Sequence, residues 1–140
     1  MELNPENEFD FWLGEWEARW GEDGQGTNQV TRILDGKVVQ EDFQAPDLHG
    51  LSFSVYDGER QLWCQTWVDN SGSYLDFTGR FENGKMILVR DAIVRGEKCK
   101  QRMVWYDIEA DQFQWNWERS DDGGETWRTL WQIHYTRLKK

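Results

Sequence analysis

Short runs of alternating apolar and polar residues, separated by turn residues, follow one another from residue 15 to residue 138. Alternation with a period of two is typical of a β-strand that buries one face. Pairs such as Asp35-Gly36, Asp57-Gly58 and Asn83-Gly84 stand between the runs, and such pairs favour tight hairpin turns. Strands joined by turns this short must pair antiparallel with their neighbours. The chain is therefore predicted to form a β-meander.

Ten runs are present, and we expect each to form a strand. Their ranges are 15–20, 27–33, 37–43, 50–56, 61–68, 73–81, 85–93, 98–106, 112–119 and 127–138. Most of the connections are tight turns. The longest interior linker is expected at Gln44–Leu48.

One short helix is predicted ahead of the first strand, over Pro5–Leu13. Pro5 suits the first helical turn, and Phe9 and Trp12 follow at helical spacing. No second helix is available to cover a sheet face, and closure into a barrel removes both edges of a ten-stranded sheet. Residues 1–140 are therefore predicted to form a single all-β domain, an up-and-down antiparallel β-barrel whose helix plugs one end.

Residue parity within the runs indicates which side chains face the interior. Large rings dominate that face, with a few polar side chains among them. The predicted interior rings are Trp16, Trp20, Trp63, Trp67, Phe113, Trp115, Trp117, Trp127, Trp131 and Tyr135, and the predicted polar residues are Gln65, Gln101 and Glu41 or Asn28. Rings with isolated polar groups are typical of a pocket for a small, partly apolar ligand. The alternative is that the ten tryptophans fill the barrel completely.

The leading hypothesis is a protein that binds one small amphipathic or aromatic molecule. Indole rings are expected to form the walls, and polar side chains to orient the polar end of the ligand. The expected walls are Trp63, Trp67, Trp115, Trp117 and Trp131, and the expected polar groups are Gln65, Glu41 and Tyr135.

Glu41 is also the best candidate for a catalytic residue. It shares a face with Val39 and Phe43, and apolar walls raise the pKa of a carboxyl group toward neutral pH, where it works as a general acid or base. The alternative function is therefore a cofactor-independent isomerase, cyclase or hydrolase. A structural pair between Glu41 and the interior Arg90 is the competing interpretation.

A third hypothesis is a filled barrel that acts only through association with another protein, for example as a homodimer. Leu62, Cys64 and Val68 alternate with the interior residues of the 61–68 run, so they are expected on its outer face. An apolar outer face of this kind is typical of an interface.

Charge argues against several classes of partner. The chain holds 16 Lys and Arg against 26 Asp and Glu, for a net charge of −10. Such a surface repels nucleic-acid phosphates and anionic lipids, so neither nucleic acid nor a membrane is expected as a partner. Residues 1–8 have no basic and apolar signal pattern, so a cytoplasmic location is expected, with Cys64 and Cys99 reduced.

No metal or other cofactor is expected. Two histidines and two scattered cysteines lack the number and spacing of a zinc or iron site. Nitrobindins, which are ten-stranded barrels of a related class, hold haem iron through a His near the C-terminus. Here parity with Trp131 and Ile133 turns His134 outward, away from any interior haem.

Gly14-Glu15-Trp16 at the start of the first strand resembles the Gly-x-Trp signature of lipocalins and their relatives. Arg137, in the last strand, stands where that superfamily places an Arg stacked on the Trp. The resemblance implies a calycin-type barrel in which a cation–π contact between Arg137 and Trp16 closes the floor.

A second resemblance spans nearly the whole chain. It rests on ordered landmarks at 9–16, 32–36, 63–70, 120–127 and 135–137, which read FDFWLGEW, RILDG, WCQTWVDN, SDDGGETW and YTR. They are similar to those of a family of small bacterial proteins known as a domain of unknown function. The resemblance implies a lipocalin-like fold and brings no activity, cofactor or catalytic residue with it.

A further motif lies in the last of the longer landmarks. Ser120, Asp122, Gly124, Thr126 and Trp127 match the Asp box of sialidases, Ser-x-Asp-x-Gly-x-Thr-Trp. That motif folds a β-hairpin by bonding side chains to turn amides, away from any chemistry. We therefore interpret it as structural, with no glycosidase activity implied.

Overall fold

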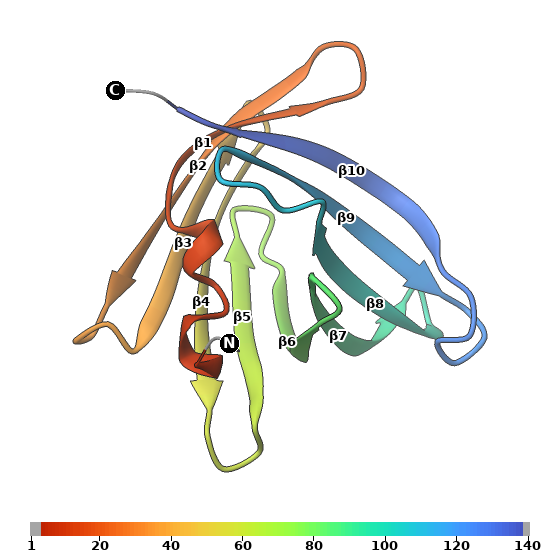
Figure 1. Ribbon diagram of the computed structural model, residues 1–140. Helices are drawn as coiled ribbons and strands as arrows, with labels where there is room; N and C mark the ends of the chain where they lie inside the picture. Colours follow the sequence, from red (N-terminus) through yellow and green to blue (C-terminus); the bar gives the residue numbers. More distant parts are fainter. Residues whose placement is uncertain (1–3, 139–140) are drawn as a thin grey trace.

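The computed structural model describes residues 4–138, and it is a closed barrel of ten antiparallel strands (Figure 1). Each strand pairs with its neighbour in the sequence, and β1 pairs with β10. The strands are β1 (Gly14–Trp20), β2 (Gly24–Ile33), β3 (Val38–Ala45), β4 (Leu48–Asp57), β5 (Leu62–Asp69), β6 (Tyr74–Glu82), β7 (Lys85–Val94), β8 (Glu97–Tyr106), β9 (Gln112–Ser120) and β10 (Arg128–Arg137). The predicted up-and-down barrel is confirmed.

The N-terminal segment plugs one end of the barrel, as predicted, but with a different backbone. In place of one continuous helix it forms two 3₁₀ turns, η1 (Pro5–Asn7) and η2 (Asp10–Trp12). Phe9, between them, has φ −97° and ψ 7°, which is outside the α-helical range. This backbone brings both Phe9 and Trp12 to the barrel interior, where each is at most 1% exposed. Burial of the two rings therefore takes precedence over helical regularity.

Arg137 ties this plug to the barrel wall. Its guanidinium lies 4.3 Å from the ring centroid of Trp16 and donates to the carbonyl oxygens of Leu13 (2.7 Å) and Phe11 (3.4 Å). Gly14 has φ +128°, and a Cβ there would collide with the Arg137 side chain. The guanidinium thus joins the ends of the chain, since β1 and β10 lie side by side.

The hairpin between β3 and β4 is tighter than predicted. The expected linker at Gln44–Leu48 is a turn of only Pro46 and Asp47, because β3 continues to Ala45 and β4 begins at Leu48. His49 therefore lies inside a strand, and its imidazole contacts Asp42 at 2.9 Å. The connection between β9 and β10, residues 121–127, is longer.

A β-bulge in β10 overturns one predicted orientation. The register shifts between Thr129 and Trp131, so parity with Trp131 does not extend back to Trp127. Trp127 lies on the outer face instead, where the Arg102 guanidinium lies 4.1 Å from its ring centroid. The prediction that Trp127 faces the interior is wrong.

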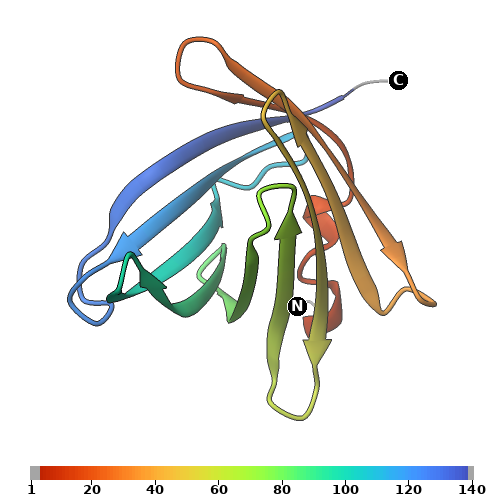
Figure 2. The same cartoon turned by 180° about the vertical axis from the view of Figure 1, so that it is seen from behind.

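Two aromatic regions occupy the barrel at different heights. We call the end that holds η1 and η2 the closed end and the opposite end, with the β3–β4, β5–β6 and β9–β10 hairpins, the open end (Figure 2). The closed end is packed with fully buried rings and aliphatic side chains, which are Phe9, Trp12, Trp16, Trp63, Trp105, Phe113, Met86 and Leu88. The open end is only partly filled.

Candidate ligand-binding site

A cavity of about 180 Å³ lies in the open end of the barrel. Its walls are almost entirely apolar, and its rings come from strands on opposite sides of the barrel. The lining residues are Trp67, Trp115, Trp117, Trp131, Phe43, Phe77, Leu48, Leu75, Met103, Ile133, Tyr135, Glu41 and Asp69. The position of each strand relative to the hairpins places Trp67 and Asp69 near the mouth and Glu41 and Tyr135 deeper, at the floor.

The indoles of the cavity are held at fixed angles to one another. Trp131 is perpendicular to Trp115, with their centroids 5.6 Å apart, and perpendicular to Trp20 at 5.2 Å. Phe43 lies 6.1 Å from Trp131 and 6.5 Å from Trp67. Edge-to-face packing of this kind is the favoured arrangement for aromatic pairs. The rings therefore support one another and leave open space between them.

Gly50 makes room for one of these walls. It lies opposite Phe43 on β4, and a Cβ at this position would collide with the Trp67 ring. Sequence reasoning missed this role. The signal was present, since Gly50 interrupts the inward-facing positions of β4 between Leu48 and Ser52 with a residue that has no side chain.

Glu41 lies at the floor of the cavity, and its side chain is bound by two neutral donors. Ser52 donates its hydroxyl to Oε1 (2.7 Å), and Asn28 donates its amide to Oε2 (2.8 Å). Burial raises the pKa of Glu41 from 4.5 to about 7, against the opposing effect of these two hydrogen bonds. The carboxyl group is therefore divided between its neutral and charged forms at physiological pH.

The structural pair between Arg90 and Glu41 is not formed. Arg90 donates to Gln101 Oε1 (2.6 Å) and lies 3.9 Å from the Asp76 carboxylate. Pairing between β6 and β7 covers only Thr78–Glu82 of β6. Arg90, on β7, lies just past the end of this pairing, and its side chain reaches Asp76 on β6. Glu41 is left without a cationic partner among the described hydrogen bonds and ion pairs.

Two buried polar side chains, on β2 and β5, have unused acceptor atoms. Gln65 donates to Ser54 Oγ (2.9 Å), but its Oε1 and the Oδ1 of Asn28 are buried and find no partner in the described part of the chain. Buried polar atoms are usually paired, and each exception calls for an explanation. Sequence reasoning named Gln65, Glu41 and Asn28 but missed Ser52 and Ser54, which face inward on β4 on either side of the exposed Phe53.

Tyr135 completes the floor. Its ring stacks on Phe113 with the centroids 4.7 Å apart. Burial raises the pKa of Tyr135 well above 10, and the nearby charge of Glu41 adds to the effect. The hydroxyl therefore stays protonated and keeps the capacity to donate a hydrogen bond.

Asp69 is an acidic group at the mouth that sequence reasoning did not single out. It accepts hydrogen bonds from the Trp67 indole nitrogen (2.7 Å) and from the backbone of Ser71 (2.9 Å). Partial burial raises its pKa, but the hydrogen bonds from Ser71 and Trp67 outweigh that effect and leave the pKa below 3.8. Asp69 is therefore ionised, and it fixes the Trp67 ring.

Six of the eight predicted ligand-binding residues line this cavity. They are Glu41, Trp67, Trp115, Trp117, Trp131 and Tyr135. Trp63 and Gln65 face inward as predicted but do not line it. Trp63 belongs to the closed end, where its ring meets Phe9 edge-on at 4.9 Å and its indole nitrogen donates to Glu8 (3.3 Å).

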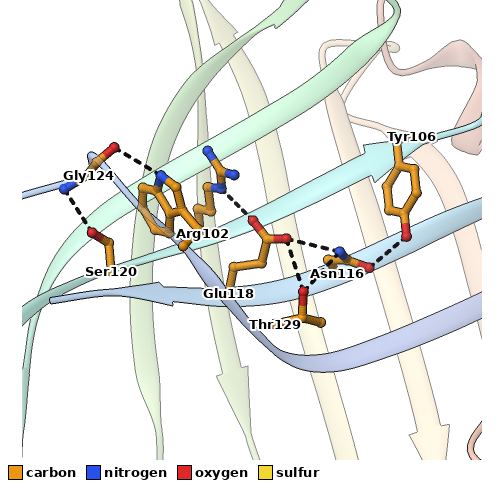
Figure 3. A network of polar contacts seen from close by, with 8 residues as sticks. Arg102, Tyr106, Asn116, Glu118, Ser120, Gly124 and Thr129 are labelled. Atoms are coloured by element: carbon orange, nitrogen blue, oxygen red, sulfur yellow. Dashed lines mark hydrogen bonds and ion pairs between the residues drawn. The ribbon is translucent and has the colours of Figure 1, made fainter. Parts of the chain in front are cut away.

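The Asp-box residues lie outside the barrel interior, in the β9–β10 hairpin. Ser120 Oγ accepts from the Gly124 amide (2.8 Å), and Asp122 accepts from the Thr126 amide (2.9 Å). Figure 3 shows Ser120 and Gly124 beside a second group on the outer face, in which Glu118 accepts from Arg102 (2.7 Å). These contacts stabilise the β9–β10 hairpin and do not reach the cavity.

The remaining candidate residues lie on the outer surface. His134 turns away from the interior and contacts the Gln114 amide at 2.7 Å. The predicted interface residues Leu62, Cys64 and Val68 lie on the outer face of β5, and Val68 is 39% exposed. Whether they bind a second protein stays a prediction.

The described residues contain neither a metal-binding cluster nor a helix that could span a membrane. No group of three or more His, Cys, Asp or Glu in residues 4–138 is arranged to hold a metal ion. No helix in the same range is long and apolar enough to cross a membrane.

Neither a protein-family model nor a curated protein matches the chain.

Proposed function

We propose that this protein binds a small, partly apolar aromatic molecule in the open-end cavity. The observation that carries the proposal is the cavity itself, with its indole walls and a buried carboxyl group at its floor. A core built for stability alone would place aliphatic side chains there and would not bury an ionisable group without a charged partner.

The volume of the cavity limits the size of the ligand. A cavity of about 150 Å³ is enough for benzene, and pockets for drug-sized ligands start near 300 Å³. At about 180 Å³, the cavity fits a molecule of one ring with a short substituent. Fatty acids, haem and flavonoids exceed this size.

Tryptophan side-chain NMR signals test the proposal and locate the site in one experiment. The probes are three one-ring compounds of different charge, namely 2-phenylethanol, 2-phenylethylamine and 3-phenylpropanoate. At least one is expected to shift the indole N–H signals of Trp67, Trp115, Trp117 and Trp131 in a saturable manner. The signals of Trp12, Trp16, Trp63 and Trp105 are expected to stay in place, because they belong to the closed end.

Trp127 serves as an internal control, since its ring lies on the outer face against Arg102. Substitution of single tryptophans by Phe assigns the signals. If none of the three probes moves an open-end signal at millimolar concentration, the proposed function is wrong.

Catalysis by Glu41 is the second candidate, because a carboxyl group with a pKa of about 7 is well suited to proton transfer at neutral pH. The same NMR samples distinguish it from binding alone. A bound probe that is recovered chemically unchanged supports binding, and conversion that disappears in Glu41→Gln supports catalysis.

We also propose that the chain is a lipocalin-like, calycin-type barrel. The stacking of Arg137 on Trp16 and its bonds to the carbonyls of the plug support this relationship. Substitutions of these two residues are therefore expected to affect the closed end and to leave ligand binding at the open end intact.

A further inference from the structure

We propose that the ligand of the open-end cavity is a small organic cation, such as an aryl or alkyl ammonium compound, held by the indole faces and by the Glu41 carboxylate. The inference rests on the proposed function and adds to it the charge of the ligand. Four features of the structure carry it.

The first feature is the sign of the charged groups in the cavity lining. Glu41 at the floor and Asp69 at the mouth are both acidic, and the described lining contains no Lys, Arg or His. Asp69 is ionised, because its hydrogen bonds hold its pKa below the ordinary value. A cation that enters the cavity therefore passes the ionised Asp69 carboxylate at the mouth and then approaches the Glu41 carboxyl group at the floor, which becomes negative when it ionises.

The second feature is the aromatic wall. Trp67, Trp115, Trp117 and Trp131 surround one small space, and the faces of indole rings attract cations more strongly than those of other aromatic side chains. The attraction grows when the cation is removed from water, as it would be in this cavity. Cavities enclosed by several aromatic rings are a known means of binding quaternary ammonium groups.

The third feature is the unbalanced environment of Glu41. Each of its carboxyl oxygens accepts one hydrogen bond, from Ser52 or from Asn28, and neither donor carries a charge. A buried carboxylate in this position costs free energy unless a cation compensates it. A ligand ammonium group would supply the charge that no described side chain provides.

The fourth feature is the set of charged and titratable groups around Glu41. Tyr135 faces it from β10 and stays neutral, and Asp69 shares its cavity from β5. Asp42, its neighbour on β3, contacts His49. No basic group among them competes for the carboxylate.

Arg90 is a basic residue close to the cavity, and its position is compatible with the proposal. Its guanidinium lies 6.0 Å from the ring centroid of Phe77, but its contacts are with Gln101 and Asp76. Arg119, also on an inward-facing position, contacts Asp121 at 2.9 Å. Neither lines the cavity, although the Nε–H of Arg90 is buried without a hydrogen-bond partner among the described residues. The anionic compound in the test below therefore measures whether Arg90 can bind an anion.

Compounds of nearly the same shape and different charge test the proposal. Phenyltrimethylammonium carries a permanent positive charge, and tert-butylbenzene is its neutral counterpart with carbon in place of nitrogen. Benzenesulfonate supplies a one-ring anion. At pH 8, we expect the cation to bind at least tenfold more tightly than the hydrocarbon, with no saturable binding of the anion, as measured by the open-end indole signals.

Glu41→Gln is the decisive variant, because it removes the charge and keeps the size of the side chain. Affinity for the cation is expected to fall at least tenfold and affinity for the hydrocarbon to change less than twofold. Asp47→Asn is the matched control. It removes the same charge from the β3–β4 turn at the open end without changing the cavity lining, and it is expected to leave both affinities unchanged.

The dependence of the cation affinity on pH is a further measurement. A Glu41 side chain with only a structural role would not produce it. Because the charge of phenyltrimethylammonium does not change with pH, the titration comes from the protein. Between pH 6 and pH 8, affinity for the cation is expected to rise about tenfold, since the ionised fraction of Glu41 rises by that factor around a pKa of about 7. The Glu41→Gln variant should show no such rise, which would identify Glu41 as the group that titrates.

Each outcome supports or overturns the proposal. If the hydrocarbon binds as tightly as the cation, or if benzenesulfonate binds more tightly, the ligand is not a cation, and the proposed binding function still stands. If cation binding survives Glu41→Gln unchanged, Glu41 does not hold the charge. If none of the three compounds shifts an open-end indole signal, the proposal fails, and the proposed function then depends on 2-phenylethanol, 2-phenylethylamine and 3-phenylpropanoate alone.

Discussion

The two ends of this barrel use the same side chain for opposite purposes. At the closed end, Trp12, Trp16, Trp63 and Trp105 are at most 1% exposed. Trp12, Trp63 and Trp105 pack against Phe9, and Trp16 packs against Phe113. At the open end, Trp67, Trp115, Trp117 and Trp131 are only partly buried and surround a cavity. The difference lies in what covers each end. Two 3₁₀ turns insert Phe9 and Trp12 into one end, and no segment of the described chain enters the other.

The boundary between the two ends is polar. Asn28, Glu41, Ser52, Ser54 and Gln65 come from four adjacent strands, β2 to β5, and form a row of inward-facing side chains. Closed-end rings lie on one side of this row and the cavity on the other. The members of this row donate hydrogen bonds to one another. The barrel can therefore hold a packed apolar core on one side of the row and a cavity with a polar floor on the other.

The largest expected effect comes from truncating one tryptophan at each end. Trp12→Ala removes a fully buried ring, and the free energy of unfolding is expected to fall by about 3–5 kcal/mol. Trp117→Ala removes a half-buried ring that already borders open space, so a loss below about 2 kcal/mol is expected. Urea unfolding measures both. Equal losses would show that the two ends do not differ in packing.

The second prediction concerns Glu41 at the floor of the cavity. Most substitutions in a core lower the free energy of unfolding, but this one is expected to raise it. The folded protein binds the Glu41 proton more tightly than the unfolded chain does, because the pKa is about 7 in one and about 4.5 in the other. Stability is therefore lost as pH rises from about 4.5 to about 7. At pH 8, Glu41→Gln is expected to raise the free energy of unfolding by about 3 kcal/mol.

This gain should disappear below pH 4.5, where Glu41 is protonated in both states. Urea unfolding at pH 4 and pH 8 measures the difference. A variant that is equally stabilised, or destabilised, at both values would contradict the interpretation of Glu41 as a buried carboxyl that is retained for a ligand.

The smallest expected effect concerns Arg137, which contacts Trp16 and the plug at the closed end. Arg137→Lys keeps the charge but loses the planar guanidinium that covers Trp16 and binds two carbonyls of the plug. A loss of about 1–2 kcal/mol is expected, because the group is partly exposed and each bond contributes modestly. Ligand affinity at the open end should not change, and a weaker affinity would indicate that the two ends are coupled.

Much of the site follows from parity alone. The alternation in the 112–119 run predicted that Trp115 and Trp117 face inward, and in the 61–68 run it predicted the same for Trp67. Parity fails where a residue is inserted, as at the bulge before Trp131, since the extra residue turns Trp127 to the outer face. No side-chain pattern in the sequence announces that bulge.

Parity also does not give height along the barrel axis. Trp63 and Trp67 lie on the same strand and the same face, yet one belongs to the packed closed end and the other to the cavity. Their separation depends on the register of β5 against β4 and on where the N-terminal turns insert. Both are long-range features, which the alternation of a single run does not contain.

The sequence by itself determined the number of strands, their antiparallel order and the inward direction of most rings, because turn residues and a period of two act locally. Only the tertiary structure decided that the rings fill one end and leave a cavity in the other, and that the Glu41 carboxyl lies between them with a pKa of about 7. Burial and hydrogen bonding depend on neighbours from distant strands, so these properties exist only once the barrel has closed.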